Sequence, residues 1–124
     1  MYILDSSALI EVLEEHPKAE KIMELVGDAE LVTTSLCVHE VLAGALSKKD
    51  RFVLEGVFSS MRILDHTMRA ARVGATIQQE LAESGTMINK FDVLIAAICK
   101  VNNGELVTLD RDFSKIKNFR VVVV

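Results

Sequence analysis

The 124-residue sequence contains one proline, six glycines and no tryptophan, and it has no Pro-, Gly- or Ser-rich tract that would act as a linker. No apolar run approaches the roughly 20 residues that a membrane-spanning helix requires. A glycine-rich phosphate loop is also missing, which argues against a nucleotide-dependent enzyme. One tyrosine and five phenylalanines predict no aromatic platform for single-stranded nucleic acid. These absences indicate one domain, residues 1–124, without a membrane anchor.

The sequence also has only two cysteines and no net positive charge. Cys37 and Cys99 both lie within helical patterns, and we expect them to be buried and reduced. Cys37 and His39 have no second ligand pair, which argues against a zinc site. The chain opens into a strand-like segment without a basic stretch, so we expect no secretory signal and a cytoplasmic location. The net charge of −4 disfavours nucleic acid, but bound divalent cations would reverse the charge locally.

What the sequence does contain is a regular alternation of apolar strand-like segments and helical patterns. Uniformly apolar strands that alternate with helices indicate the α/β fold class, with a parallel sheet covered on both faces. In such sheets, ligands bind outside the carboxyl ends of the strands, where the strand order reverses. We expect strands at residues 2–5, 31–34, 62–64, 106–109 and 120–124, and helices at 6–14, 17–26, 35–46, 48–59, 67–83 and 88–102.

Four acidic residues occupy positions where a core element would normally carry an apolar or neutral side chain. Asp5 and Asp110 each follow an apolar strand, so we expect both at the carboxyl edge of the sheet. Glu40 and Asp92 lie on the apolar stripes of two helical patterns, which predicts that they point inward or into a cleft. Carboxylates are almost never buried unless they are paired or bind a cation. The four acids therefore indicate a shared divalent cation.

Each of these acids also has an ordinary structural interpretation. Asp5 can cap the helix that follows it, and Glu40 can turn outward at the margin of its stripe. Asp92 can cap a helix that begins late, near Val93, and Asp110 can be a turn residue. Clustered carboxylates repel one another, however, and a hard divalent ion with oxygen ligands removes that cost. Two-metal phosphodiester hydrolases hold such ions about 4 Å apart.

Five further residues flank the acids in the sequence. Ser7 and Thr108 place hydroxyl groups beside the two acids that follow strands, where they can orient a carboxylate or a water. Their ordinary roles are helix capping and strand packing. Asp112 is an additional candidate ligand, although it can also cap the short turn after it. Lys90 and Arg111 are candidates for contacts with phosphate groups, against the alternative of solvated surface charges.

Four segments in order, residues 2–10, 38–44, 91–97 and 106–113, carry a family resemblance. The chain resembles PIN-domain ribonucleases over nearly its whole length, specifically VapC-type toxins of toxin–antitoxin pairs. The resemblance implies a three-layer α/β/α domain with a five-stranded parallel sheet, and Mg²⁺- or Mn²⁺-dependent endonucleolytic cleavage of RNA. It assigns the catalytic and metal-binding positions to Asp5, Glu40, Asp92 and Asp110, with Asp112 as a further ligand and Ser7 and Thr108 as supporting hydroxyls.

The same resemblance implies a homodimer and a cognate antitoxin that reaches into the site. Two other functions stay open. A non-catalytic PIN-fold binding or scaffold protein would keep the fold without the activity. A receiver-like phospho-aspartate signalling domain has a similar doubly wound sheet, but it needs a second acid beside Asp5, where Ser6 and Ser7 stand. It also needs a lysine at the end of the 106–109 strand, where the sequence has none.

Overall fold

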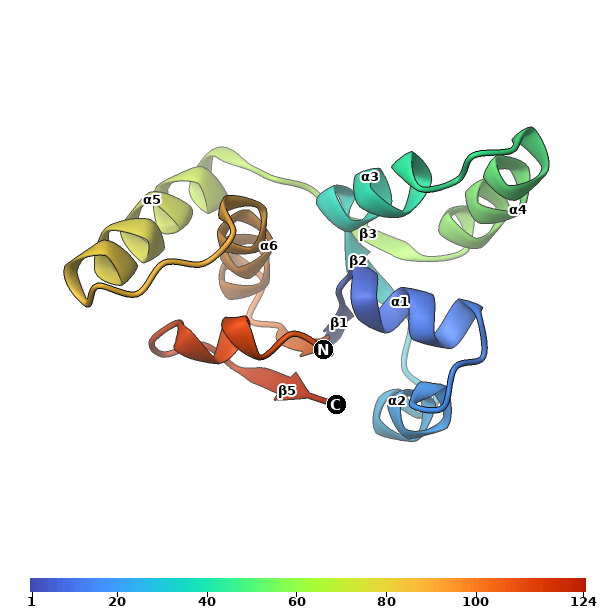
Figure 1. The fold of residues 1–124 in the computed structure, drawn as a ribbon, viewed down its shortest axis with the longest axis horizontal. Coiled ribbons are helices and arrows are strands. Elements are labelled where there is room, and N and C mark those ends of the chain that lie inside the picture. Colours follow the sequence, from blue (N-terminus) through green and yellow to red (C-terminus); the bar gives the residue numbers. More distant parts are fainter.

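Five parallel strands form a central sheet that six α-helices cover on both faces (Figure 1). The computed structural model describes all residues of the sequence, 1–124. The predicted three-layer α/β/α fold with a five-stranded parallel sheet is confirmed. In chain order the elements are β1 (Tyr2–Leu4), α1 (Ser6–Leu13), α2 (Ala19–Val26), β2 (Val32–Thr34), α3 (Ser35–Ala43), α4 (Lys48–Ser59), β3 (Arg62–Leu64), α5 (Met68–Glu83), α6 (Lys90–Val101), β4 (Glu105–Thr108), the 3₁₀ helix η1 (Arg111–Lys115) and β5 (Val121–Val123).

The strand order places β1 and β4 side by side in the middle of the sheet. The order is β3-β2-β1-β4-β5, and every neighbouring pair is parallel. The sheet grows from β1 toward β2 on one side and continues with β4 on the other, so its direction of growth reverses between β1 and β4. Leu4 pairs with Val107, so the carboxyl ends of these two strands are adjacent. Ligand sites of α/β proteins lie at such a reversal.

This strand order also rules out the receiver-like alternative. The flavodoxin-like order of receiver domains places the third strand of the chain beside the first. Here β4 occupies that position, and β3 lies at the far edge of the sheet. The prediction of a receiver-like domain is therefore wrong as a description of this fold.

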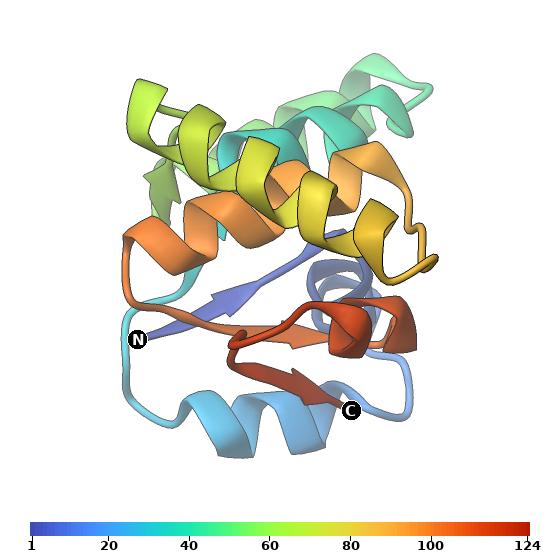
Figure 2. The ribbon, with the colours of Figure 1, turned by 90° about the vertical axis from the view of Figure 1, so that its left-hand side faces the viewer.

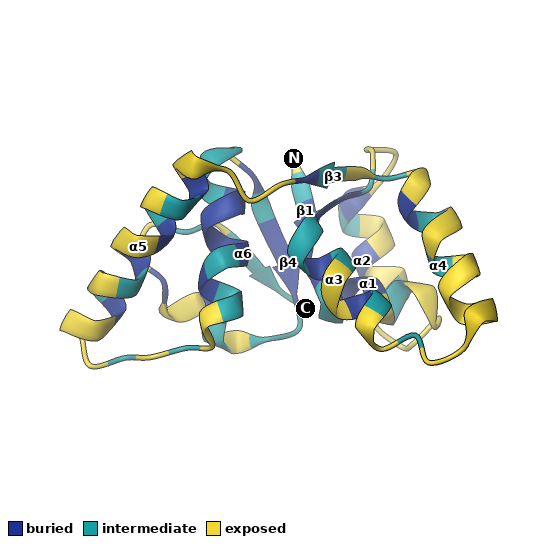
Figure 3. Cartoon of the chain, turned by 90° about the horizontal axis from the view of Figure 1, so that it is seen from above, coloured by how far each residue is buried: buried dark blue, intermediate teal, exposed yellow.

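The helices form two layers that differ in how deeply they are buried. Figure 3 shows α5 and α6 on one side of the sheet and α1 to α4 on the other, and Figure 2 looks onto the α5–α6 side. α6 is the most buried helix, with Val93 and the run 95–99 inside the core. Gly74 of α5 allows close packing, because a Cβ atom there would already touch the Ala97 side chain at 3.4 Å. No helix combines the length and the apolar character that crossing a membrane requires.

Two helices begin on a capping residue at the end of a strand. The Asp5 carboxylate accepts a hydrogen bond from the Ala8 amide and caps α1. Thr34 caps α3, and its hydroxyl accepts from the Cys37 amide at 3.1 Å. Each cap is the residue directly after or at the end of a strand, so its backbone is still extended, as an N-cap requires. The polar groups at the carboxyl edge of the sheet thus also start the helices.

Two helix boundaries, the start of α2 and the end of α3, differ from the predicted ones by two and three residues. α2 begins at Ala19 instead of residue 17, because Lys18 takes the cap position after the proline. α3 ends at Ala43, three residues before the predicted end at 46. Ser47 caps α4 by accepting from the Asp50 amide, so the chain must leave α3 early to enter the next helix. The other elements fall within about two residues of their predicted bounds.

Gly104, in the turn that leads into β4, gives a test of core packing. A Cβ atom at this position would lie 2.2 Å from Cδ1 of Ile3, which is completely buried in β1. We expect Gly104→Ala to destabilise the protein by about 1–3 kcal/mol, because the fully buried Ile3 side chain would have to move within the packed core. Chemical denaturation measures the change.

Gly56→Ala is the matched control for this substitution. Gly56 lies in the exposed interior of α4, and nothing would touch an added Cβ within 4 Å. Since alanine is the better helix former, we expect a gain in stability of about 1 kcal/mol. Equal stability of Gly104→Ala and the unaltered protein would contradict the packing described for Ile3.

Candidate active site

Asp5 is the most deeply buried acid of the protein, with 5% of its surface exposed. Its Oδ1 accepts hydrogen bonds from the Ser7 hydroxyl at 2.6 Å and the Ala8 amide at 3.0 Å. Its Oδ2 accepts from the Thr108 hydroxyl at 2.5 Å. Burial raises the pKa of Asp5 above its ordinary value, while these three donors pull the pKa down, and repulsion from Glu40 raises it further. The donors fix the orientation of both carboxylate oxygens.

The two hydroxyls tie the ends of β1 and β4 into one network. The Leu109 amide donates to the Ser7 oxygen at 3.0 Å, and the Asp110 amide donates to the Thr108 oxygen at 3.0 Å. Each hydroxyl therefore accepts from the backbone after β4 and donates to Asp5. Ser7 and Thr108 thus lie beside the acids, and both donate hydrogen bonds to the Asp5 carboxylate. Their role as supporting hydroxyls of the site stays a prediction.

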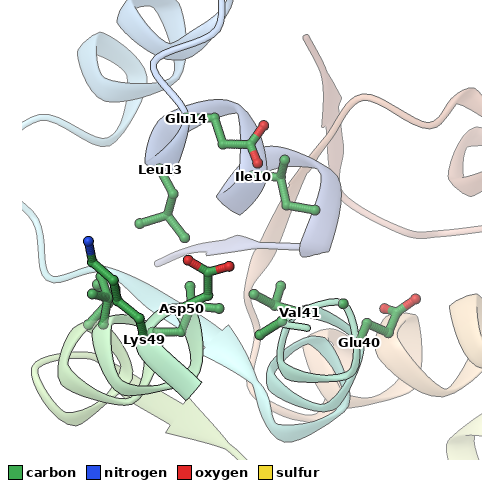
Figure 4. Close-up of a pocket in the computed structure, with 12 residues that line it drawn as sticks. Ile10, Leu13, Glu14, Glu40, Val41, Lys49 and Asp50 are labelled. Carbon is green, nitrogen blue, oxygen red and sulfur yellow. The ribbon is translucent and has the colours of Figure 1, made fainter. Parts of the chain in front are cut away.

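Glu40 lies at the exposed margin of the apolar stripe on its helix. It belongs to the exposed residues of α3, and its Oε1 accepts a hydrogen bond from the Ser6 hydroxyl at 2.7 Å. In Figure 4 its carboxylate points away from Leu13 and Lys49. Of the two expected placements of Glu40, inward or into a cleft, the structure shows the second, because Glu40 is exposed and lines a groove between α1, α3 and α4. It nevertheless faces the other acids closely enough to raise the pKa of Asp5 and of Asp92.

Asp92 is half-buried in the first turn of α6. Asn89 caps this helix by accepting a hydrogen bond from the Phe91 amide, so the interpretation of Asp92 as an N-cap is wrong. Burial and repulsion from four other carboxylates raise the pKa of Asp92 to about 6; the repelling groups, strongest first, are Asp110, Glu40, Asp5 and Asp112. Negative charge near a helix N-terminus is normally favourable. Here the repulsion and the loss of hydration outweigh that attraction.

The raised pKa of Asp92 makes the stability of the metal-free protein depend on pH. The folded state holds this proton more tightly than the unfolded state does. The favourable contribution of the protonated group is complete below its ordinary pKa of 3.8 and is lost as the pH rises through about 6. At neutral pH the ionised cluster therefore works against folding unless a positive charge binds to it.

Asp110 and Asp112 follow β4 and have different surroundings. Asp110 caps η1, because its Oδ1 accepts a hydrogen bond from the Asp112 amide at 2.9 Å. The cap of this turn is therefore Asp110, and the expectation that Asp112 caps it is wrong. Asp112 instead forms an ion pair with Lys115 at 2.9 Å, with about half of each side chain exposed. Asp112 is the weakest of the carboxylates that repel Asp92.

The donor set suits a hard divalent cation in its chemistry. Asp5, Glu40, Asp92 and Asp110 supply only oxygen atoms, and none of them forms an ion pair with a lysine, arginine or histidine. Oxygen ligands of this kind are those that Mg²⁺ and Mn²⁺ prefer. No three acidic, histidine or cysteine side chains are placed as a ready-made ligand set. The carboxylates are thus near enough to repel one another without being drawn in to ligand distances.

Two cationic side chains lie near the acids in the sequence and point into solvent. Lys90 and Arg111 are exposed, and neither forms an ion pair within the protein. Both therefore keep their donors free for a ligand. The two cysteines, by contrast, are buried and free, as we expected.

One pair of side chains next to these acids was not predicted from the sequence. His39 and Phe91 lie next to Glu40 and Asp92 in the sequence, and their rings are in edge contact with centroids 5.9 Å apart. The composition predicted no aromatic platform, and the neighbouring Cys37 drew attention to metal ligation instead. Only the packing of α3 against α6 brings the two rings together.

A family model described as PIN domain matches residues 2–118 of this chain. The tRNA(fMet)-specific endonuclease VapC of Salmonella typhimurium is 25% identical over 125 residues, covering 97% of this chain and 95% of that protein. The structure of DNA-bound VapBC from Salmonella typhimurium matches with a TM-score of 0.84 at 26% identity, covering 98% of this chain and 96% of that chain. The structure of VapBC2 from Rickettsia felis bound to a promoter DNA fragment also matches with a TM-score of 0.84 at 23% identity, covering 98% of this chain and 96% of that chain.

Fold and site together define an α/β/α domain whose acidic residues gather where the strand order reverses. The family match covers nearly the whole of that domain, from β1 to beyond η1. The chain belongs to the PIN domain family. The predicted resemblance to PIN-domain proteins of the VapC type is thereby confirmed.

The order of the repelling carboxylates around Asp92 can be measured. In metal-free protein we expect a pKa of about 6 for Asp92 in an NMR titration of side-chain carboxyl carbons. Asp110→Asn should lower it most, because Asp110 is the strongest repelling group, and the control Asp112→Asn should lower it least. Addition of Mg²⁺ or Mn²⁺ should also lower it, since a bound cation favours the ionised form. An unchanged pKa in Asp110→Asn would contradict this arrangement.

Proposed function

We propose that this protein is a divalent-cation-dependent endoribonuclease that acts as the toxin of a toxin–antitoxin pair. The observation that carries the proposal is the gathering of four carboxylates from four different elements at the strand-order reversal, with no cationic side chain to balance them. The 25% identity to a tRNA(fMet)-specific endonuclease along nearly the full chain supports this activity. Mg²⁺ or Mn²⁺ is the cation that we propose.

The side chains of the site have separate roles in this proposal. Asp5, held by its three donors, provides a fixed carboxylate at the floor of the site. Asp92 and Asp110 lie beside it, and Glu40 is held near them by the hydrogen bond that it accepts from Ser6. When bound, the cation would supply charge stabilisation for the scissile phosphate and a more acidic water. We place Asp112 at the rim, because Lys115 already pairs with it.

Lys90 and Arg111 are the proposed contacts to the phosphates of RNA on either side of the cleaved bond. Both are exposed and unpaired, so binding to phosphate would not break an existing ion pair. Phosphate contacts by lysine and arginine supply much of the affinity of nucleic-acid-binding proteins. With a net charge of −4, the protein depends on such local contacts and on the cation.

RNA cleavage in the presence of Mg²⁺ or Mn²⁺ tests the activity. Asp5→Asn and Asp92→Asn should each lower the cleavage rate by about 100-fold or more, because even supporting residues of metal sites contribute about 10- to 100-fold. A chelator should abolish cleavage by the unaltered protein. Cleavage products are measured on a labelled tRNA pool.

Asp28→Asn is the matched control for these acids. Asp28 is exposed in the turn after α2, outside the acidic cluster, so its substitution should leave cleavage unchanged. If Asp5→Asn and Asp92→Asn cut RNA as fast as the unaltered protein, the proposed active site is wrong. A folded protein that binds RNA but cuts none under any metal condition would favour the alternative, a non-catalytic PIN-fold binding or scaffold protein.

An apolar groove beside the acidic site supports an antitoxin as partner. The groove has a volume of about 430 Å³ and lies between α1, α3 and α4 (Figure 4). Glu40 lies in its wall, so a segment bound there would end next to the acids. Its apolar members include exposed side chains that a partner would cover; the lining residues are Ile10, Leu13, Glu14, Glu40, Val41, Gly44, Ala45, Lys49, Asp50, Val53, Leu54 and Val57.

We propose that the cognate antitoxin lays an apolar segment in this groove and blocks the acidic site. We also propose a cytoplasmic location and a homodimer, in keeping with VapC-type proteins. The matching VapBC structures are toxin–antitoxin assemblies of relatives, which supports an antitoxin for this chain. The groove and the acids share Glu40, which supports inhibition by direct obstruction of the site.

Charge placed in the groove should separate inhibition from catalysis. Val53 lines the groove and is 56% exposed, so Val53→Asp should be tolerated by the fold. We expect it to weaken inhibition by the cognate antitoxin by about tenfold or more, because a carboxylate would lose its hydration on binding. Titration of antitoxin into the RNA cleavage assay measures this effect.

Met68→Asp serves as the control for the groove variant. Met68 is 68% exposed at the start of α5, away from the residues that line the groove. It should leave both cleavage and inhibition unchanged. If Val53→Asp and Met68→Asp respond equally to the antitoxin, the groove is not its binding surface.

A further inference from the structure

The rim of the acidic site carries an aromatic pair that the proposed chemistry does not use. His39 comes from α3 and Phe91 from α6, and each is the immediate neighbour of an acid, Glu40 and Asp92 respectively. The ring centroids are 5.9 Å apart at an interplanar angle of 65°. This is the edge-to-face geometry that aromatic pairs prefer. The pair links α3 and α6, the two helices that carry Glu40 and Asp92.

The two rings differ in how firmly the fold holds them. Phe91 is half-buried and packs against the hydrophobic core, whereas His39 belongs to the exposed residues of its helix. In an edge-to-face pair, the contact leaves the flat faces of the outer ring partly free. His39 therefore presents an aromatic surface to solvent, backed by a phenyl ring that restricts its movement.

The fold gives this pair no other evident task. The contact between α3 and α6 is already made by buried residues of both helices, including Cys37 on α3 and the buried run of α6. The His39 ring takes part in no hydrogen bond or ion pair, unlike His16, which contacts two glutamates. An exposed ring held in place without polar partners is suited to stacking.

We propose that His39, backed by Phe91, stacks on an unpaired base of the RNA strand adjacent to the cleaved phosphate. This inference rests on the proposed ribonuclease function. An aromatic face accepts any base, because every base has a flat π-surface, and such stacking is tolerant of sequence. Stacking also needs no positive charge, which is in short supply on this protein. His39 is then a binding residue that positions the strand over the acids.

The location of His39 fits the requirements of such a contact. A base next to the cleaved phosphate must lie within one nucleotide of the carboxylates, and His39 is adjacent to Glu40 on the same helix. Lys90 precedes Phe91 on the other side of the opening and is free to bind the phosphate of the same nucleotide. One nucleotide would thus meet a stacking face and a cation from the two helices that flank the site.

Steady-state cleavage of a short single-stranded RNA by the full-length protein tests the proposal. We expect His39→Ala to raise KM about tenfold while kcat stays within about twofold, a size typical of the loss of one stacked base. His39→Phe should restore KM, since it keeps an aromatic face without the imidazole. His66→Ala is the control, because His66 is exposed in the loop before α5, away from the acids.

A second measurement reports stacking without cleavage. The same RNA with 2-aminopurine beside the cleaved phosphate is mixed with protein in the presence of Mg²⁺, and its fluorescence is followed before the first turnover. Quenching on binding should be lost in His39→Ala and kept in His39→Phe. This readout works whether or not the protein cuts RNA, so failure of the proposed function is distinguishable from failure of the stacking contact.

Three outcomes would overturn the stacking contact. One is an unchanged KM together with unchanged quenching in His39→Ala. Another is a fall in kcat with normal KM, which would make the pair a positioning contact for the acids. The third is a loss in His39→Ala that His39→Phe does not restore, which would assign the effect to the imidazole nitrogens instead of to an aromatic face.

Discussion

The site depends on a buried carboxylate, Asp5, and on the three donors that hold it. Burial of an ionised carboxylate is costly unless it is hydrogen-bonded, so these donors favour the ionised form of Asp5 against the effect of burial. Ser7 and Ala8 lie in the first turn of α1, directly after β1, and Thr108 ends β4, so the donors come from both sides of the strand-order reversal. The pairing of β1 with β4 therefore also fixes the orientation of the Asp5 carboxylate. The other acids are arranged around that fixed group.

The acidic cluster places stability and function in opposition. Burial and mutual repulsion raise the pKa of Asp92 to about 6, and no lysine or arginine neutralises the four acids. A protein selected only for stability would place a basic or apolar side chain here. The deeply buried α6 helix and the central strands supply the packing that offsets this cost. A cation that binds only the folded state would return stability to the protein, which links folding to loading of the site.

Hydrophobic periodicity and turn chemistry were sufficient to predict all five strands and six helices, because each element has a clear apolar face. The rule that ligands lie at strand carboxyl ends was sufficient to bring Asp5 and Asp110 together. The contact of Glu40 with Ser6 was not predicted, because Ser6 comes from a different helix and a local stripe cannot reveal such a contact. The pairing of His39 with Phe91 was missed for the same reason: it arises only when α3 packs against α6.

Glu40 connects the acidic cluster with the apolar groove, and this double position has a physical consequence. The same side chain repels Asp92 on one side and forms part of the groove wall on the other. A segment that fills the groove must pass Glu40 and so alters both the hydration and the charge balance of the cluster. Because Glu40 raises the pKa of both Asp5 and Asp92, a change in its surroundings alters both acids. In the proposed complex, obstruction of the site and a weaker hold on a cation would then be two effects of one binding event.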